Sequence, residues 1–137
     1  MSTPTDSQKN FEAITIGQDM GTFEMTLDEE TVRDRMDLVR WQAGGLVEKG
    51  LAAPGLTISH HARMKFDALP AMRVSIWAKS EQEFLKPMKV GSRIFISGKI
   101  VDKYTRRGRN YIVTELETTD ESGEVILRSR ETGVYVE

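Results

Sequence analysis

The sequence predicts an α+β fold in which a curved antiparallel sheet wraps around one buried helix. Three long β-type runs fill residues 93–136, and the two short turns between them end in Gly108 and Gly123. Such short connections make consecutive strands antiparallel. Residues 57–69 form a helical pattern that is apolar around much of its circumference and stops at Pro70, which is typical of a buried helix. Several antiparallel strands and one buried helix allow few other compact arrangements.

The composition is that of one ordinary globular domain. The chain has 137 residues, of which 19 are Lys or Arg and 21 are Asp or Glu, for a formal net charge of -2. A nucleic-acid-binding protein would normally show a basic surplus, and no apolar run approaches the roughly 20 residues of a membrane span. Residues 1–10 are polar and indicate a flexible tail before a single domain over residues 11–137. With no Cys and no secretory signal, we expect a cytoplasmic protein.

The first half of the chain predicts two short strands and a charged helix. Residues 11–17 and 23–26 alternate in the manner of strands. Thr26 and Glu29 fit a capping box, with the Thr26 hydroxyl on the Glu29 amide. The helix that follows should end near Gly44 and Gly45, where the backbone can take positive φ. Its apolar stripe consists of Val32, Met36 and Val39.

The second half predicts the buried helix and four strands. The inward positions of the helix are Ile58, Ala62, Phe66 (or Met64) and Leu69. A short strand covers residues 73–78, and a linker with Glu81, Glu83 and Pro87 leads to the strand over residues 93–104. In that strand one face is formed by Ile94, Ile96, Gly98 and Ile100. The last two strands should cover residues 110–118 and 124–136.

Five segments in this order resemble the MaoC-like hot-dog family of R-specific enoyl-CoA hydratases and dehydratases. They are FEAITIG, TLDEETVRDRMDLV, APGLT, FLKPMKVGSRI and ESGEVILRSR, spread from Phe11 to Val136. The resemblance implies a hot-dog fold, association at least as a dimer, and lyase chemistry on acyl-CoA thioesters without a cofactor. Ser92 departs from the family pattern, which usually has Asp after the glycine at Gly91.

The catalytic dyad of the resembled hydratases is missing here. That family places an Asp and a His just after the charged helix, because water addition needs a carboxylate and an imidazole at one reactive carbon. Arg40 and Trp41 stand where Gly-Asp is expected, and the loop from there to Pro54 contains no Asp, Asn or His. Trp41 cannot accept a proton, since indole is only a donor, so it is at most a substrate-binding residue.

His60 and His61 are the chain's two histidines, so imidazole catalysis would have to use one of them. Their side chains point about 100° apart on the buried helix. In one interpretation one of them is a substitute acid or base. In the other, one is a core residue with a hydrogen-bonded ring and its neighbour is partly exposed. A metal site is not expected, because adjacent histidines on a helix face different ways.

Two further sets of residues are candidates for substrate binding. Gly55 begins the buried helix, and the resemblance implies that its free amide forms an oxyanion hole for the thioester carbonyl; a plain Pro-Gly turn is the alternative. A basic cluster at a hairpin tip, Arg106, Arg107 and Arg109, could hold the phosphates of coenzyme A. It could instead contact RNA or simply be a solvated hairpin end. Trp77 is expected in the core or in a subunit contact.

These observations together predict an acyl-thioester-binding protein of the hydratase or dehydratase type. Because the dyad is absent, it is either a catalytically silent subunit beside a second hot-dog subunit or a diverged enzyme that uses His60 or His61. The partners would be an acyl thioester and another hot-dog chain, in a homodimer or a heteromer, with no nucleic acid and no membrane. A thioesterase is the first alternative, with Asp67 as the acid on the helix and Glu48 as the other nearby acid. A carrier of small apolar ligands is the second.

Overall fold

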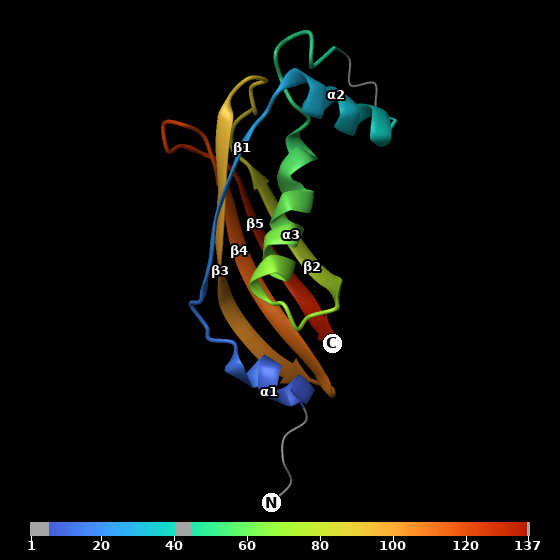
Figure 1. The fold of residues 1–137 in the computed structure, drawn as a ribbon, viewed down its shortest axis with the longest axis vertical. Helices are drawn as coiled ribbons and strands as arrows, with labels where there is room; N and C mark the ends of the chain where they lie inside the picture. The colour runs from blue at the N-terminus through green and yellow to red at the C-terminus, as the bar shows by residue number, and fades with distance from the viewer. Residues whose placement is uncertain (1–5, 41–44, 137) are drawn as a thin grey trace, which may run out of the picture.

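A single antiparallel sheet curves around one helix in the computed structural model, which describes residues 6–40 and 45–136 (Figure 1). Along the chain the elements are α1 (Asp6–Ala13), β1 (Asp19–Thr26), α2 (Glu29–Leu38), the 3-10 helix η1 (Pro54–Thr57), α3 (Ile58–Ala68), β2 (Val74–Phe84), β3 (Arg93–Arg106), β4 (Arg109–Thr119) and β5 (Val125–Val136). The strand order is β1-β3-β4-β5-β2, and every neighbouring pair is antiparallel. The predicted α+β class and the meander of the last three strands are confirmed.

The two turns of the meander follow from local chemistry. The β3–β4 connection has two residues, Arg107 and Gly108, both at positive φ (52° and 76°), as tight hairpins require. In the β4–β5 turn the Asp120 carboxylate accepts hydrogen bonds from the amides of Ser122 and Glu124, at 2.9 and 3.0 Å. These turns fix the register of all three strands.

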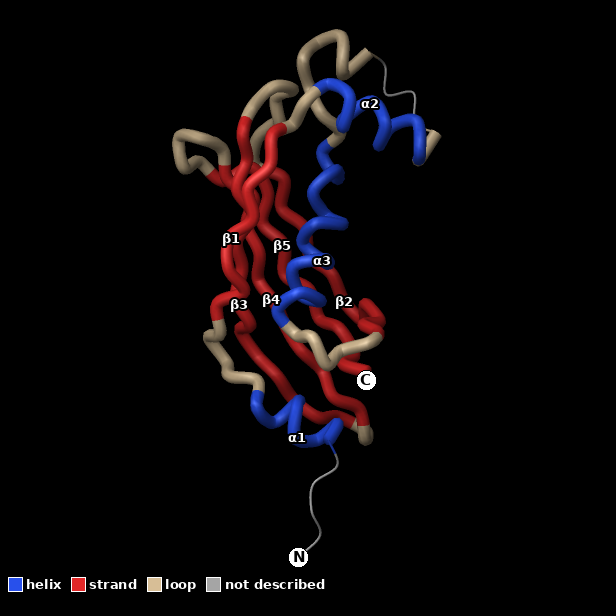
Figure 2. The backbone as a smooth tube through the Cα atoms, viewed as in Figure 1, coloured by secondary structure: helices blue, strands red, loops and turns tan. Residues whose placement is uncertain are grey.

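Helix α3 lies along the concave face of the sheet, and α1 and α2 lie at opposite ends of the molecule's long axis (Figures 1 and 2). The predicted helix over residues 57–69 is therefore confirmed. Its orientation is as predicted only in part. Met64 and Leu69 are buried, as predicted, but Ile58, Ala62 and Phe66 are only half-buried. His61 and Lys65 face the sheet instead, at 0% and 1% exposure. None of the described helices has the length and apolarity that would let it cross a lipid bilayer.

The core residues of β3 that face α3 are among the most completely buried. Ile94, Ile96 and Ile100 are all fully buried, which confirms their predicted common face. Gly98 belongs to this face, and a Cβ there would lie 2.7 Å from Leu116 Cγ and 2.9 Å from a backbone oxygen. A glycine is needed at this close approach, because no side chain could fit without moving its neighbours.

The N-terminal region differs from its prediction. Residues 11–17 are not a strand: α1 begins at Asp6, inside the predicted flexible tail, and continues through Phe11 to Ala13. Phe11 and Ile14 are 8% and 7% exposed, and the Phe11 ring lies 5.7 Å from the Tyr135 ring. Apolar residues three apart suit a helix as well as an irregular strand, so packing against the sheet decides between the two.

The boundaries of α2 also differ from the prediction. Asp28, not Thr26, caps the helix, and its carboxylate accepts the Thr31 amide at 2.7 Å. Thr26 is the last residue of β1, where it pairs with Arg93. The helix ends at Leu38, and Arg40 has a φ of 54°, so the chain leaves the helix before the predicted stop. Of the apolar stripe, Val32 is buried and Val39 is half-exposed (51%).

Strand β2 is longer than predicted. It runs from Val74 to Phe84 and pairs with β5 as far as Phe84 and Leu127, with an irregularity between Trp77 and Lys79. The charged stretch assigned to a linker is thus part of the strand. Charged side chains are usual on an edge strand, where they oppose pairing with other chains.

Candidate functional site

A seam of buried polar side chains runs between α3 and the sheet. On the helix side it has Thr57, His61 and Lys65, spaced four residues apart and therefore on one face. We define the polar seam as these three with four sheet residues that are 0–4% exposed: Thr114, Thr118, Ser129 and Glu131. Sequence reasoning singled out only His61 among them. The signal was present in the polar spacing of the helix and in the alternation of Ser129 and Glu131 along β5.

The amino-terminal half of the seam is fully hydrogen-bonded. His61 Nδ1 lies 2.7 Å from Ser129 Oγ, and its Nε2 lies 2.8 Å from Thr118 Oγ1. Thr118 Oγ1 is also 3.3 Å from Thr57 Oγ1. Burial, with a smaller contribution from the neighbouring His60, lowers the pKa of His61 to about 4. The ring is therefore neutral near pH 7, donates from one nitrogen and accepts at the other.

In the carboxyl-terminal half the buried polar atoms lack such partners. Within residues 6–40 and 45–136, no hydrogen-bond partner reaches Lys65 Nζ, Thr114 Oγ1 or either carboxylate oxygen of Glu131. Burial lowers the pKa of Lys65, and the charge of Glu131 opposes that shift. Burial raises the pKa of Glu131, and the charge of Lys65 and the nearby Gln82 amide, which lies outside hydrogen-bond geometry, oppose that shift. The two groups thus act on each other electrostatically without a direct hydrogen bond.

His60 occupies a different environment from its neighbour. It is half-buried, and its ring stacks on Phe23 of β1 at 5.8 Å with an interplanar angle of 22°. Burial lowers its pKa, and the charge of Arg35 lowers it further. The two histidines therefore face different sides of α3, as their spacing predicts, and no carboxylate hydrogen-bonds either ring among the described residues.

An apolar hollow of about 390 Å³ lies at the amino end of η1. One side is formed by Leu46, Leu51, Ala52 and Pro54, which lie before or at the start of η1. The other side is formed by the end of β2 and the loop after it, with Phe84, Leu85 and Met88, and by Ile126 of β5. Phe84 and Leu85 are 51% and 45% exposed. A volume of this size suits a small ligand, since ligand pockets range from about 300 to 1,000 Å³.

Gly55 follows Pro54, which lines this hollow. A Cβ at Gly55 would meet only Ile58 Cδ1, at an ordinary 3.5 Å, and Gly55 is not among the glycines with positive φ. Neither packing nor backbone geometry requires a glycine here. The first amides of a helix lack intrahelical acceptors. Pro54 has no amide hydrogen, and the Leu56 amide donates to the Ala53 carbonyl oxygen at 3.1 Å. The open amide at this point is therefore that of Gly55, and its small side leaves room for an outside group.

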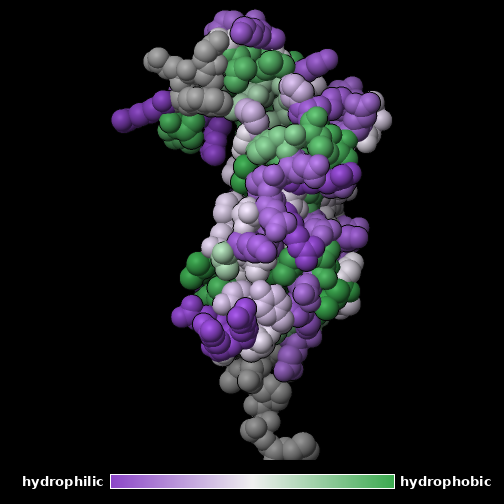
Figure 3. All heavy atoms as spheres, turned by 180° about the vertical axis from the view of Figure 1, so that it is seen from behind, coloured by the Kyte–Doolittle hydropathy of each residue, from purple (hydrophilic) through white to green (hydrophobic). Residues whose placement is uncertain are grey.

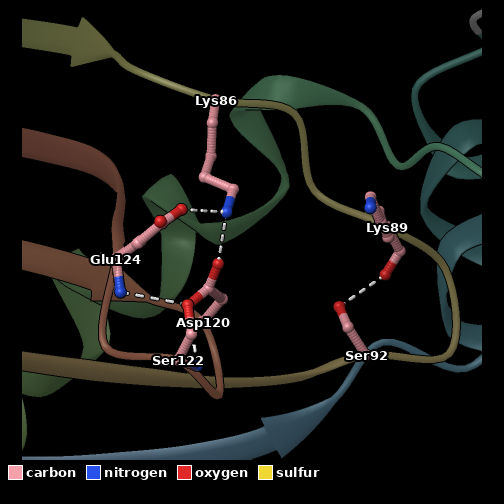
Figure 4. A network of polar contacts seen from close by, with 6 residues as sticks. All are labelled: Lys86, Lys89, Ser92, Asp120, Ser122 and Glu124. Carbon is pink, nitrogen blue, oxygen red and sulfur yellow. Dashed lines mark hydrogen bonds and ion pairs between the residues drawn. The ribbon is translucent and has the colours of Figure 1, made fainter.

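An ion-pair network holds one wall of the hollow in place (Figure 4). The Lys86 ammonium contacts the carboxylates of both Asp120 and Glu124, so it ties the loop after β2 to the β4–β5 turn. The hydrogen bonds from Lys86 and Ser122 hold the pKa of Asp120 well below its usual range. In the same loop Ser92 Oγ donates to the Lys89 carbonyl oxygen at 2.6 Å. Ser92, where the resembled family has Asp, therefore closes a turn.

The basic hairpin cluster lies far from this hollow. Arg106 and Arg109 face each other across the β3–β4 turn, at the end of the sheet near α1 (Figure 1). Arg109 and Thr118 are nine positions apart along β4, and Thr118 contacts Thr57. At about 3.3 Å per residue this is roughly 30 Å. Within one subunit the structure therefore does not bring the arginines and Gly55 together.

The other candidates have ordinary surroundings or cannot be described. Asp67 is exposed (66%) and pairs with Arg63 at 3.3 Å, and Glu48 pairs with Arg33 on the surface at 3.5 Å. Trp77 on the edge strand is 45% exposed, and Trp41 lies outside the described residues. Within the described ranges no three His, Asp or Glu side chains come close enough together to hold a metal ion.

Comparison with known proteins identifies the fold. No family model and no curated protein matches the sequence. Among solved structures, the chain is similar to the (R)-hydratase from A. caviae involved in PHA biosynthesis (TM-score 0.76, 12% identity, covering 91% of this chain and 99% of that one). It is also similar to the C-terminally truncated HadBC complex, a 3R-hydroxyacyl-ACP dehydratase from Mycobacterium tuberculosis (TM-score 0.72, 16% identity, 89% and 98%). A third is the MaoC-like dehydratase from Rhodospirillum rubrum (TM-score 0.67, 15% identity, 92% and 96%). The chain has the hot-dog fold of MaoC-like proteins, and the predicted resemblance is confirmed at the level of the fold.

Proposed function

We propose that this chain is a cytoplasmic, acyl-thioester-binding hot-dog subunit of the hydratase and dehydratase type, for enoyl-CoA or 3-hydroxyacyl-CoA. One observation carries the proposal: a glycine that packing does not require, Gly55, lies in the 3-10 helix η1 that leads into α3, next to Pro54 of the apolar hollow. The free amides and the positive dipole end of a helix stabilise a carbonyl oxygen that gains negative charge. The hollow takes the apolar acyl chain, and the Gly55 amide takes the thioester carbonyl.

The subunit is catalytically silent or diverged. The loop between Arg40 and Pro54 supplies no Asp or His. Both ring nitrogens of His61 are engaged by hydroxyls, and His60 stacks on an aromatic ring. In neither arrangement does an imidazole lie next to a carboxylate, and this supports the hypothesis of a catalytically silent subunit. In that case a second hot-dog subunit supplies the acid and the base.

The first half of the edge strand β2 supports a partner subunit, since its charged stretch lies in the second half, from Lys79 onward. Three half-exposed apolar side chains lie in the first half, Val74 and Ile76 on one face of the strand and Trp77 on the other, at 48%, 56% and 45%. An uncovered apolar edge strand favours pairing with another chain. The HadBC structure is itself a complex of hot-dog subunits. Arg106, Arg107 and Arg109, remote from Gly55 in their own subunit, could then hold the coenzyme A phosphates at a site of the partner.

The direct test is Gly55→Ala, read by binding of an acyl-pantetheine thioester. The added methyl group occupies the approach to the Gly55 amide, so we expect binding to weaken at least tenfold while the folded state is unchanged or slightly more stable. Ser59→Ala, on the exposed side of the first turn of α3, is the matched control and should bind as the native chain does. Equal binding by Gly55→Ala would contradict the oxyanion role.

Activity assays separate the alternatives. Addition of crotonyl-CoA to the purified chain should leave the enoyl absorbance unchanged, and activity should appear only with a dyad-bearing hot-dog partner. Turnover by the chain alone that His60→Ala or His61→Gln abolishes would support a diverged enzyme instead. Release of free thiol, lost in Asp67→Ala, would indicate a thioesterase. Binding of a free fatty acid as tightly as its thioester would indicate a carrier.

A further inference from the structure

The sheet face that points away from α3 carries a polar hollow of about 500 Å³ beside the β3–β4 hairpin. Figure 3 views the molecule from this side, and hydrophilic side chains gather across its middle. Six of the lining residues carry the argument: Lys79, Tyr104, Arg106, Arg107, Tyr111 and Arg130. This hollow shares no residue with the apolar hollow at Pro54, so it is a separate site.

Two tyrosines form an aromatic wall of the outer-face hollow. Tyr104 and Tyr111 are direct partners across the β3–β4 pair, and their rings stack at 5.0 Å with an interplanar angle of 14°. Tyr104 is 38% exposed, so the stack is open to solvent. Parallel rings held upright on a rigid hairpin offer a flat surface on which a planar base can stack.

Cations surround this aromatic wall. Four basic residues line the hollow against two acids, Glu81 and Asp102. Lys79 pairs with Glu81 at 3.5 Å and Arg130 pairs with Glu115. The side chains of Arg106 and Arg107 have no ion-pair or hydrogen-bond partner in the part of the chain that the structure describes, although the Arg106 backbone pairs with Arg109. Their guanidinium groups are therefore available to an anion.

The hairpin geometry fixes where these arginines stand. Arg107 has a φ of 52° and is followed by Gly108 at 76°, so the turn has one tight conformation. Arg106 precedes it in β3, two residues beyond Tyr104 and on the same face of the strand. Arginine is well suited to phosphate, because its planar fork donates two parallel hydrogen bonds.

We propose that the outer-face hollow binds a nucleoside diphosphate. The base stacks on the Tyr104–Tyr111 wall, and the phosphates lie against Arg106 and Arg107. The volume suits a single nucleotide, and the chain's net charge of -2 disfavours a long polyanion. The proposal does not rest on thioester binding at Gly55, because the two hollows lie on opposite faces of the sheet and near opposite ends.

ADP titrated into the full chain, followed by calorimetry, tests this site. We expect saturable binding to the native chain. Tyr104→Leu, which keeps an apolar side chain but removes the ring, should weaken binding at least fivefold. Arg106→Gln combined with Arg107→Asn should weaken it at least tenfold and flatten its salt dependence; asparagine is chosen because it tolerates the positive φ of this turn.

Arg128→Gln is the matched control, since Arg128 lies on the same sheet outside this hollow and pairs with Glu117 at 3.1 Å. Circular dichroism checks that each variant is folded. The proposal is wrong if millimolar ADP does not bind, or if the Tyr104 and arginine variants bind no more weakly than Arg128→Gln.

Two further ligands, coenzyme A and oligoadenylate, test whether the nucleotide that this site recognises belongs to a small molecule or to RNA. Coenzyme A that binds with the affinity of ADP, and loses it in the same variants, supports the site and shows that the nucleotide is the recognised part. Oligoadenylate that binds more tightly as its length grows would overturn the proposal in favour of an RNA surface. Acyl-pantetheine lacks a nucleotide, so its binding reports only on Gly55, and failure of one site is distinguishable from failure of the other.

Discussion

The two halves of the polar seam under α3 bury their polar groups in different ways. In the amino-terminal half, His61 is neutral and its ring is closed into hydrogen bonds with Thr118 and Ser129. In the carboxyl-terminal half, Lys65 and Glu131 are equally buried but make no direct hydrogen bond to a described residue. Neutral groups can be buried at little cost when each is bonded, whereas charges remain costly unless they are paired or neutralised. The stability of the fold should therefore be most sensitive at Lys65 and Glu131.

The largest effect is expected from Lys65→Met. This change leaves the Glu131 carboxyl buried with no cation to offset its charge. Breaking a directly bonded buried pair costs about 3–5 kcal/mol, and that is the upper limit here, because Lys65 and Glu131 act on each other without a direct contact. Urea denaturation at pH 7 measures the loss. Lys65→Met with Glu131→Leu should recover most of it. If the double variant is no more stable than the single one, the two groups are not coupled.

The next effect is the pH dependence that His61 contributes. Its folded pKa is about 4, below the ordinary 6.5 of the unfolded chain. The unfolded chain takes up this proton as pH falls below 6.5, and the folded chain does not until about pH 4. Stability is therefore fully present above about pH 6.5 and is lost as pH falls toward 4, by up to about 3 kcal/mol.

His61→Gln is the variant that isolates this contribution, because its amide can still bond both hydroxyls but does not titrate. Unfolding free energies at pH 7 and near pH 4 should differ less in the variant than in the native chain. Carboxylates titrate in the same range, so only the difference between the two chains is informative. An identical pH dependence would mean that folding does not shift the pKa of His61.

Gly133→Ala should have a smaller effect, of about 1–3 kcal/mol. A Cβ there would lie 2.5 Å from Ser75 Oγ and 3.0 Å from Lys65 Nζ, so the glycine makes room for the buried ammonium. Ser75→Ala removes the nearest atom and should restore part of the loss measured by urea denaturation. A fully tolerated Gly133→Ala would show that this half of the seam is loosely packed.

The smallest effect is expected on the opposite side of α3. Asp67→Asn breaks an exposed pair with Arg63, and exposed pairs contribute at most about 0.5–1 kcal/mol. The melting temperature should move little compared with Lys65→Met. A large loss would show that the outer side of the helix is covered in the native assembly.

Much of the fold could be read from periodicity. The alternation of Ile94, Ile96 and Ile100 and the glycine-ended turns predicted the meander, because period-two patterning and tight turns are local properties. The helix over residues 57–69 was also predictable, since Pro70 stops it. The edge strand β2 and helix α1 were not, because charge on an edge and apolar residues three apart are each compatible with more than one structure.

The site was less predictable than the fold. The side chains of His61 and Ser129 are in contact although the residues are 68 positions apart in sequence. No local sequence pattern predicts such a contact. The sequence by itself determined that a meander covers a helix beginning at Pro54 and that the expected Asp and His are missing from the loop before it. The tertiary structure alone decided that the helix turns Thr57, His61 and Lys65 toward the sheet, because the rotation of a helix depends on all the side chains that it packs against.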